Sequence, residues 1–112
     1  PADLPEGLAM AAVLPRADAR DALVSRDDLR LADLPPGSRV GTCSLRRQAQ
    51  VRAAYPQLEM IPIRGNVPTR LQKVAEGQVE AAILAMAGLA RLGLENRVCE
   101  IFSESFMVPA AG

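Results

Sequence analysis

The chain has 112 residues, 49% of them hydrophobic and 23% charged, which is typical of one globular domain and excludes a disordered or fibrous protein. Thirteen basic and thirteen acidic side chains cancel, so no overall field favours nucleic acid or a membrane surface. Histidine is absent and Cys43 and Cys99 lie far apart, so we predict no metal site and no Cys–His nucleophile pair.

The N-terminal part of the chain predicts short strands separated by turns. A buried strand is expected over residues 7–14, because this run is apolar and ends at a proline. A second short strand is expected over 21–25. A single helical turn is expected over 30–34, because the Pro-Pro-Gly sequence at 35–37 ends it. Residues 38–41 then lead into the first of two arginine-rich turns.

A helix is predicted from Ser44 to about Tyr55, where the following proline ends it. Leu45, Ala49 and Arg52 share one side of this helix at the helical spacing.

The next predicted elements are a strand over 59–63 and a helix with a clear beginning and end. Asn66 is a good N-cap, Pro68 suits the first turn, and Gly77 suits the end of the helix. The residues predicted for the buried side of this helix are Leu71, Val74 and Ala75.

The C-terminal part predicts a strand over 79–84, a small-residue helix over 85–92 that Gly93 ends, and an extended piece over 106–109. Strands and helices that alternate with short links favour an α/β domain with a mainly parallel sheet flanked by helices. In such sheets, ligands bind beyond the carboxyl ends of the strands.

Two stretches, 41–47 and 64–70, put arginine pairs where this pattern predicts that a strand leads into a helix. A helix N-terminus already carries partial positive charge, so arginine there is unfavourable without a partner. An anion between guanidinium groups and helix-start amides would supply that partner. The alternative for the first pair is solvated surface or pairing with Asp27, Asp28 or Glu59. No aspartate forms a recognisable acid/base pair, so we assign no catalytic residue.

Four motifs then carry a resemblance to a known family. They cover residues 14–25, 39–48, 63–71 and 82–94, in order and in register. Together they resemble the second domain of porphobilinogen deaminase, also called hydroxymethylbilane synthase. The resemblance implies one α/β domain over 1–112, similar to type II periplasmic-binding proteins, with 1–12 and 105–112 as segments that cross the hinge.

The resemblance also implies an activity. The family joins four porphobilinogen molecules into linear hydroxymethylbilane with release of ammonia, for tetrapyrrole and heme synthesis. Its dipyrromethane cofactor is attached to a cysteine of the third domain, and a catalytic aspartate comes from the first. Because neither domain is present here, the resemblance implies that this chain alone is inactive.

The resemblance assigns cofactor- or substrate-binding roles to eight residues, of which Ala85 would line the cleft. The cofactor would contact Thr42, Ser44, Arg46, Arg47, Arg64 and Arg70. Substrate and the growing polypyrrole chain would contact Arg64, Arg70, Ala85 and Arg91. From the residues alone, Arg91 is a favourable cation at a helix C-terminus. Cys43 and Pro68 depart from the family pattern, which usually has serine and glycine at these positions.

The expected partners are porphobilinogen, the growing chain and the first and third domains, without nucleic acid or membrane. We further expect a monomer in the cytoplasm, because the sequence shows no export signal and no long apolar run. The alternative function is a non-enzymatic module of periplasmic-binding-protein type that binds a small anion.

Overall fold

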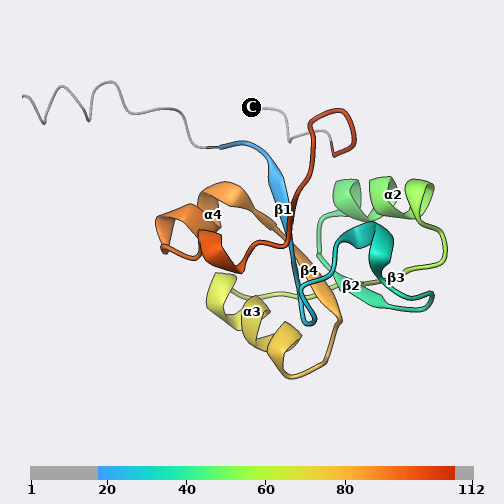
Figure 1. Cartoon of the computed structure of the whole chain (residues 1–112), viewed down its shortest axis with the longest axis horizontal. Coiled ribbons are helices and arrows are strands. Elements are labelled where there is room, and N and C mark those ends of the chain that lie inside the picture. The colour runs from blue at the N-terminus through green and yellow to red at the C-terminus, as the bar shows by residue number, and fades with distance from the viewer. Residues whose placement is uncertain (1–17, 108–112) are drawn as a thin grey trace, which may run out of the picture.

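The computed structural model describes residues 18–107, which form a five-stranded sheet with helices on both faces (Figure 1). The strands are β1 (Asp21–Ser25), β2 (Arg39–Gly41), β3 (Glu59–Ile61), β4 (Ala81–Ala85) and β5 (Glu100–Ile101). The helices are α2 (Leu45–Ala54), α3 (Val67–Ala75) and α4 (Met86–Arg91), with 3-10 turns η1 (Leu31–Asp33) and η2 (Glu95–Arg97). The predicted strand 7–14 and crossing segment 1–12 lie outside the described residues.

The strand order is β3-β2-β4-β1-β5. β2 pairs in parallel with β3 and β4, whereas β1 pairs antiparallel with β4 and β5. The predicted α/β class and the sheet flanked by helices are confirmed. Of the described strands, β2, β3, β4 and β5 run in the same direction and β1 runs against them, so the sheet is mixed. Sequence periodicity marks a strand but not its direction, which depends on the strands that become its neighbours.

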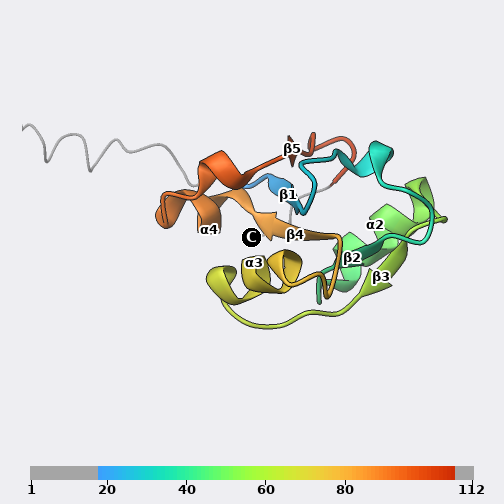
Figure 2. The same ribbon diagram turned by 60° about the horizontal axis from the view of Figure 1, so that its bottom comes forward.

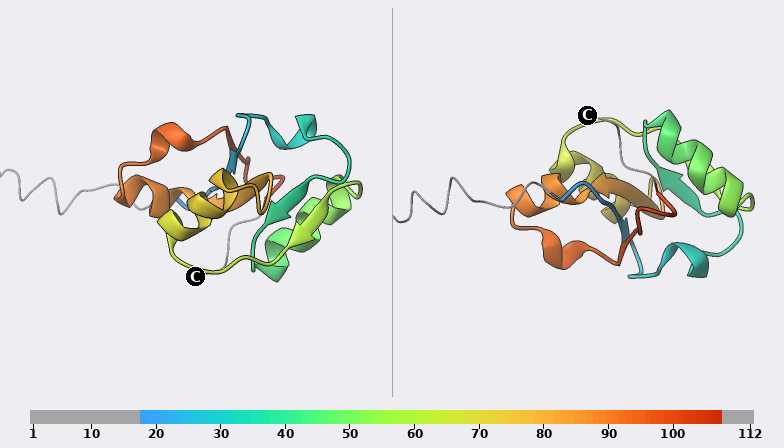
Figure 3. Two further views of the ribbon diagram at one scale, coloured as in Figure 1. Left: turned by 90° about the horizontal axis from the view of Figure 1, so that it is seen from below. Right: turned by 90° about the horizontal axis from the view of Figure 1, so that it is seen from above.

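The two central strands, β1 and β4, are buried on both faces. Leu23 and Ile83 pack into the cluster on the α2 side, while the alternate residues Ala22, Val24 and Leu84 pack against α3 and α4. Two views from opposite sides show α2 and α3 on opposite faces of the sheet (Figure 3). The helices α3 and α4 lie side by side along the β4–β1 half of the sheet (Figure 2).

The local signals for helix ends are confirmed. Ser44 caps α2 by accepting a hydrogen bond from the Arg47 amide, and Asn66 caps α3 by accepting one from the Thr69 amide. Gly77, just beyond α3, has φ +81°, a conformation that favours glycine. These ends depend on contacts within a few residues, so the sequence alone predicts them.

The side of α2 that Leu45, Ala49 and Arg52 share faces away from the core. Leu45 is 78% exposed and Ala49 and Arg52 are also exposed, whereas Gln48 and Val51 are buried. The buried Gln48 amide donates to the Thr42 carbonyl at 2.7 Å, which satisfies its polar group inside the domain. In α3, Leu71 and Val74 are buried as predicted, but Ala75 is exposed.

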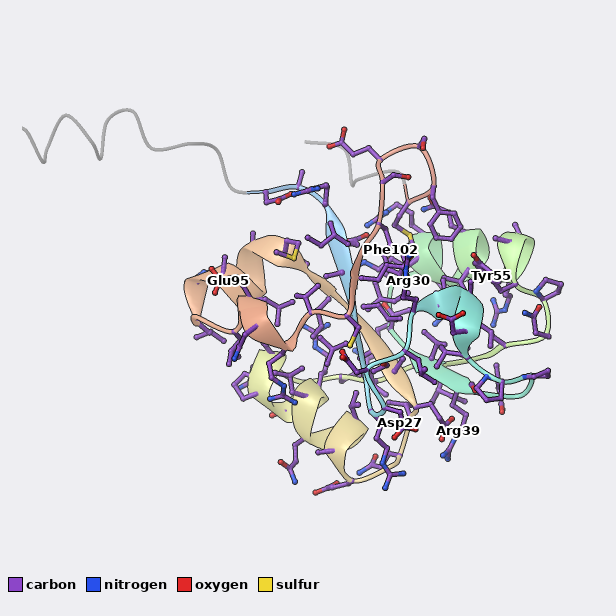
Figure 4. All side chains as sticks on the ribbon, viewed as in Figure 1. Asp27, Arg30, Arg39, Tyr55, Glu95 and Phe102 are labelled. Atoms are coloured by element: carbon purple, nitrogen blue, oxygen red, sulfur yellow. The ribbon has the colours of Figure 1, made fainter. Side chains whose placement is uncertain are left out.

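The C-terminal part differs from the predicted extended piece. Residues 103–106 form a turn in which the Phe106 amide donates to the Ser103 carbonyl at 3.1 Å. The Phe106 ring contacts Tyr55 and Phe102, with ring centroids 6.1 and 5.5 Å apart. Figure 4 shows Tyr55 and Phe102 on the same side of the molecule. This aromatic contact holds residues 105–107, the described part of the predicted crossing segment 105–112, against α2.

One ion pair joins β2 to the beginning of β4. Glu80 accepts from the Arg39 amide at 2.6 Å and from the Arg39 guanidinium at 3.1 and 2.6 Å, and Arg39 also donates to the Gly77 carbonyl. These hydrogen bonds lower the pKa of Glu80 from 4.5 to about 2.

We predict that Glu80→Gln lowers the free energy of unfolding at pH 7 by about 1 kcal/mol, because the variant keeps the shape but loses the charged partner of Arg39. The contribution should be full above pH 4.5 and decline as the pH falls toward 2, since the folded state holds the carboxylate ionised over that range. Urea unfolding of both proteins between pH 2.5 and 7 measures it. A difference independent of pH would contradict this account.

Candidate functional site

The candidate site lies at the edge of the sheet where the parallel strands β2 and β4 end. From β2 the chain continues through α2 to β3 on one side, whereas β4 lies on the other side of β2. Such a change of direction opens a crevice beyond the carboxyl ends of the strands. Because β1 is antiparallel and Asp21 pairs with Ala85, the beginning of β1 reaches the same edge.

A hollow of about 310 Å³ lies at this edge, and β1, α2, the β4–α4 junction and the segment just before β1 line it. Its lining residues include Asp18, Asp21, Arg46, Arg47, Ala85 and Ala87. Three of the predicted site residues, Arg46, Arg47 and Ala85, are therefore brought together. The two arginines are the second and third residues of α2. They therefore lie at the beginning of a helix, as the sequence predicted.

The carboxylate of Asp21 bridges the two arginines. Its Oδ1 accepts from Arg47 Nη2 at 2.8 Å and its Oδ2 accepts from Arg46 Nη2 at 3.2 Å. Asp21 is 3% exposed, so this carboxylate is buried with its cationic partners. The alternative prediction, that the arginines pair with Asp27, Asp28 or Glu59, is wrong. Asp21, at the buried beginning of β1, supplies the acid instead.

Thr42 and Ser44 stabilise the beginning of α2. The Thr42 hydroxyl accepts from the Ser44 amide at 3.1 Å, and the Ser44 hydroxyl accepts from the Arg47 amide at 3.1 Å. A hydroxyl that accepts in this way still has its own hydrogen to donate to an anion. Thr42 is 1% exposed, whereas Ser44 is partly exposed. Ser44 is therefore the more accessible donor.

A second hollow, of about 460 Å³, lies between α3 and α4 and has Arg70 and Arg91 in its lining. Burial, and to a lesser extent the positive charge of Arg47, lower the pKa of Arg70 from its ordinary value. The charges of Arg47 and Arg70 therefore interact, although the two side chains line different hollows. Guanidinium groups stay charged at neutral pH even when partly buried.

Two guanidinium atoms in this region lack partners among residues 18–107. Arg47 Nε and Arg70 Nε are both buried and make no hydrogen bond there. An unsatisfied buried donor costs roughly 1–3 kcal/mol, more for a charged group. A ligand with carboxylates could accept hydrogen bonds from these two atoms and would be attracted by the positive charge of the arginines.

The exposed side chain of Arg64 lies on the loop between β3 and α3, outside the residues that line these two hollows. Its carbonyl accepts from Lys73 Nζ at 3.2 Å. Cys43 is an exposed free cysteine whose thiol donates to the Ile63 carbonyl at 2.8 Å. This contact ties the first arginine-rich turn to the residue before Arg64, in the loop between β3 and α3.

Sequence reasoning missed Asp21 as a site residue. The available signal was an acidic residue at the first position of a strand that is otherwise apolar, because a charge predicted to be buried needs a partner. Which partner it would find could not be read from the sequence, since 25 residues separate Asp21 from Arg46.

The fold is an α/β domain whose sheet has helices on both faces, and a cationic crevice lies at the carboxyl ends of its parallel strands. All 112 residues match the family model described as porphobilinogen deaminase, dipyromethane cofactor binding domain. The chain is 55% identical over its full length to the porphobilinogen deaminases of Thiobacillus denitrificans and Neisseria meningitidis serogroup A, and 50% identical to that of a Roseiflexus species. The chain belongs to the porphobilinogen deaminase family.

The chain spans a little over a third of the length of these relatives: 37% for Thiobacillus denitrificans and Roseiflexus and 36% for Neisseria meningitidis. Within residues 18–107, no helix is both long and apolar enough to cross a membrane. The resemblance predicted from the sequence motifs is confirmed at the level of the family.

Gly65 shapes the loop that connects Arg64 to α3. It has φ +114°, and a Cβ there would lie 2.7 Å from Thr69 Cγ2 and 2.9 Å from Thr69 Cβ. Gly37 also has a positive φ, +83°, but no atom lies within 4 Å of its Cβ position. A comparison of substitutions at the two glycines therefore separates the cost of a positive φ from the cost of overlap with Thr69.

We predict that Gly65→Ala lowers the free energy of unfolding by roughly 1–3 kcal/mol more than Gly37→Ala, because only the former also overlaps Thr69. Chemical denaturation of the two variants measures the difference. Equal losses would mean that the Arg64 loop adjusts freely and that Thr69 does not constrain it.

Proposed function

We propose that this chain is the part of a hydroxymethylbilane synthase that holds the carboxylates of the dipyrromethane cofactor, of porphobilinogen and of the growing polypyrrole chain. The family match supports the cofactor. The observation that carries the proposal is the convergence of Arg46 and Arg47 in one hollow, with the buried Nε atoms of Arg47 and Arg70 unsatisfied among the described residues.

The donor set fits this ligand chemistry. Each pyrrole unit carries an acetate and a propionate, and planar guanidinium groups match carboxylates with two parallel hydrogen bonds. Arg46 and Arg47 would hold cofactor carboxylates together with the Ser44 and Thr42 hydroxyls. Arg64, Arg70 and Arg91 would hold carboxylates of the substrate and of later units. When bound, the cofactor supplies the pyrrole to which the first substrate unit is joined.

The residues of this chain then act by binding and orientation. Fixed positive charge balances the carboxylates that accumulate as the product grows, and it holds each ring in a defined position. Ala85 and Ala87 have small side chains at the bottom of the crevice, which would let a ring approach the strand ends. The reacting groups would come from the first and third domains, and a cytoplasmic monomer remains our expectation for the whole protein.

We predict that the chain binds porphobilinogen, and that Arg70→Gln weakens this binding about tenfold while leaving the fold unchanged. Arg70 is the informative variant, because its Nε is unpaired among the described residues and its removal exposes no buried carboxylate. Arg52→Gln, an exposed position on α2, is the matched control and should bind like the parent.

Titration by calorimetry or nuclear magnetic resonance measures these affinities. Equal affinity of the Arg70→Gln and Arg52→Gln variants would contradict the assigned role of Arg70. Binding of acetate or phosphate as tightly as porphobilinogen would instead favour the alternative, a module that binds a small anion.

We further predict that this chain alone forms no hydroxymethylbilane from porphobilinogen, because our assignment leaves the catalytic aspartate and the cofactor cysteine in other domains. Incubation with porphobilinogen, followed by acid oxidation and measurement of uroporphyrin absorbance, tests this. Turnover above that of a heat-denatured sample would refute the division of labour proposed here.

A further inference from the structure

One acidic residue in the cationic crevice has no role in the function proposed above. Asp21 is 3% exposed and begins β1, between β4 and β5. Its carbonyl accepts from the Phe102 amide at 2.9 Å, so the residue is held by strand pairing on a rigid part of the sheet. A buried carboxylate costs several kcal/mol unless cations pair with it, which makes its position here informative.

The two arginines could not converge through helix geometry alone. Consecutive helical residues point about 100° apart, so neighbouring side chains on a helix do not normally face one another. Arg46 and Arg47 are consecutive in α2, yet each donates to a different oxygen of Asp21, at 3.2 and 2.8 Å. The Asp21 carboxylate therefore draws together two guanidinium groups that helix geometry and charge repulsion would otherwise keep apart.

The bridge leaves donor capacity for a ligand. Arg47 Nη1 makes only a 3.4 Å contact with the Ile83 carbonyl, and Arg47 Nε has no partner among the described residues. Asp18, which lines the same hollow, is already paired with Arg20 through contacts of 2.7–3.3 Å.

We propose that Asp21 is a positioning residue for the cofactor- and substrate-carboxylate site: its buried carboxylate holds Arg46 and Arg47 side by side, so that together they receive a ligand carboxylate. This inference rests on the proposed function, and it deepens it by naming what organises the arginines. Asp21 acts through the guanidinium groups and does not itself contact the ligand in this assignment.

The proposal predicts an effect opposite in sign to simple electrostatics. Asp21→Asn removes a negative charge beside an anion site, which by Coulomb attraction alone should strengthen binding. If Asp21 positions the arginines, the variant should bind porphobilinogen at least tenfold more weakly, because the two cations separate. Asp21→Glu keeps the charge but lengthens the side chain, and it should also weaken binding.

The matched control is Glu80→Gln, which also removes a carboxylate from an arginine pair. Glu80 lies at the opposite end of β4 from Ala85, the residue that pairs with Asp21, so its loss should leave the affinity for porphobilinogen unchanged. Circular dichroism verifies that each variant is folded. Where Asp21→Asn does not fold, Asp21→Glu provides the test. Affinity that is unchanged or increased in the folded Asp21 variants overturns the proposal.

A second readout does not depend on the ligand. Nuclear magnetic resonance of the Arg47 side chain reports rotation about the Nε–Cζ bond, which a carboxylate bridge slows. We expect this rotation to accelerate severalfold in Asp21→Asn and not in Glu80→Gln; equal rates in the parent and Asp21→Asn would overturn the proposal. If the parent chain binds no porphobilinogen at millimolar concentration, the proposed function fails, and the rotation measurement still decides the role of Asp21.

Discussion

A buried carboxylate between two adjacent arginines is the interaction on which the crevice depends. Asp21 is held by strand pairing with β4 and by the Phe102 amide, so it gives the guanidinium groups of Arg46 and Arg47 a rigid reference point. Without it, two like charges would lie at the positive end of a helix without this buried counter-charge. The acid makes the arrangement possible in the folded protein, while Arg47 Nε has no partner among the described residues and can donate to an incoming anion.

The sheet topology decides where this charge is displayed. α2 and α3 cover opposite faces, yet both begin beyond the ends of parallel strands, so their arginine-rich turns meet at one edge. The antiparallel strand β1 completes the crevice because its first residue lies opposite the last residue of β4. An all-parallel arrangement would put the beginning of β1 at the other edge, away from the arginines.

Several features of the fold could be predicted because neighbouring residues determine them. The caps Ser44 and Asn66 and the glycine after α3 follow from hydrogen bonds and backbone conformations that span a few residues. The inner face of α2 could not be predicted in this way. Gln48 is buried because a carbonyl in the preceding loop accepts its amide hydrogen, while the apolar Leu45 remains exposed beside the arginines.

The sequence by itself determined the α/β class, the helix ends, the two arginine-rich turns and the family, since motifs and local propensities are written in consecutive residues. Only the tertiary structure decided the strand directions, the short strand β5, and the pairing of Asp21 with arginines 25 and 26 positions away. These features depend on contacts between distant segments, where burial and electrostatic compensation select one arrangement among many that the same local pattern allows.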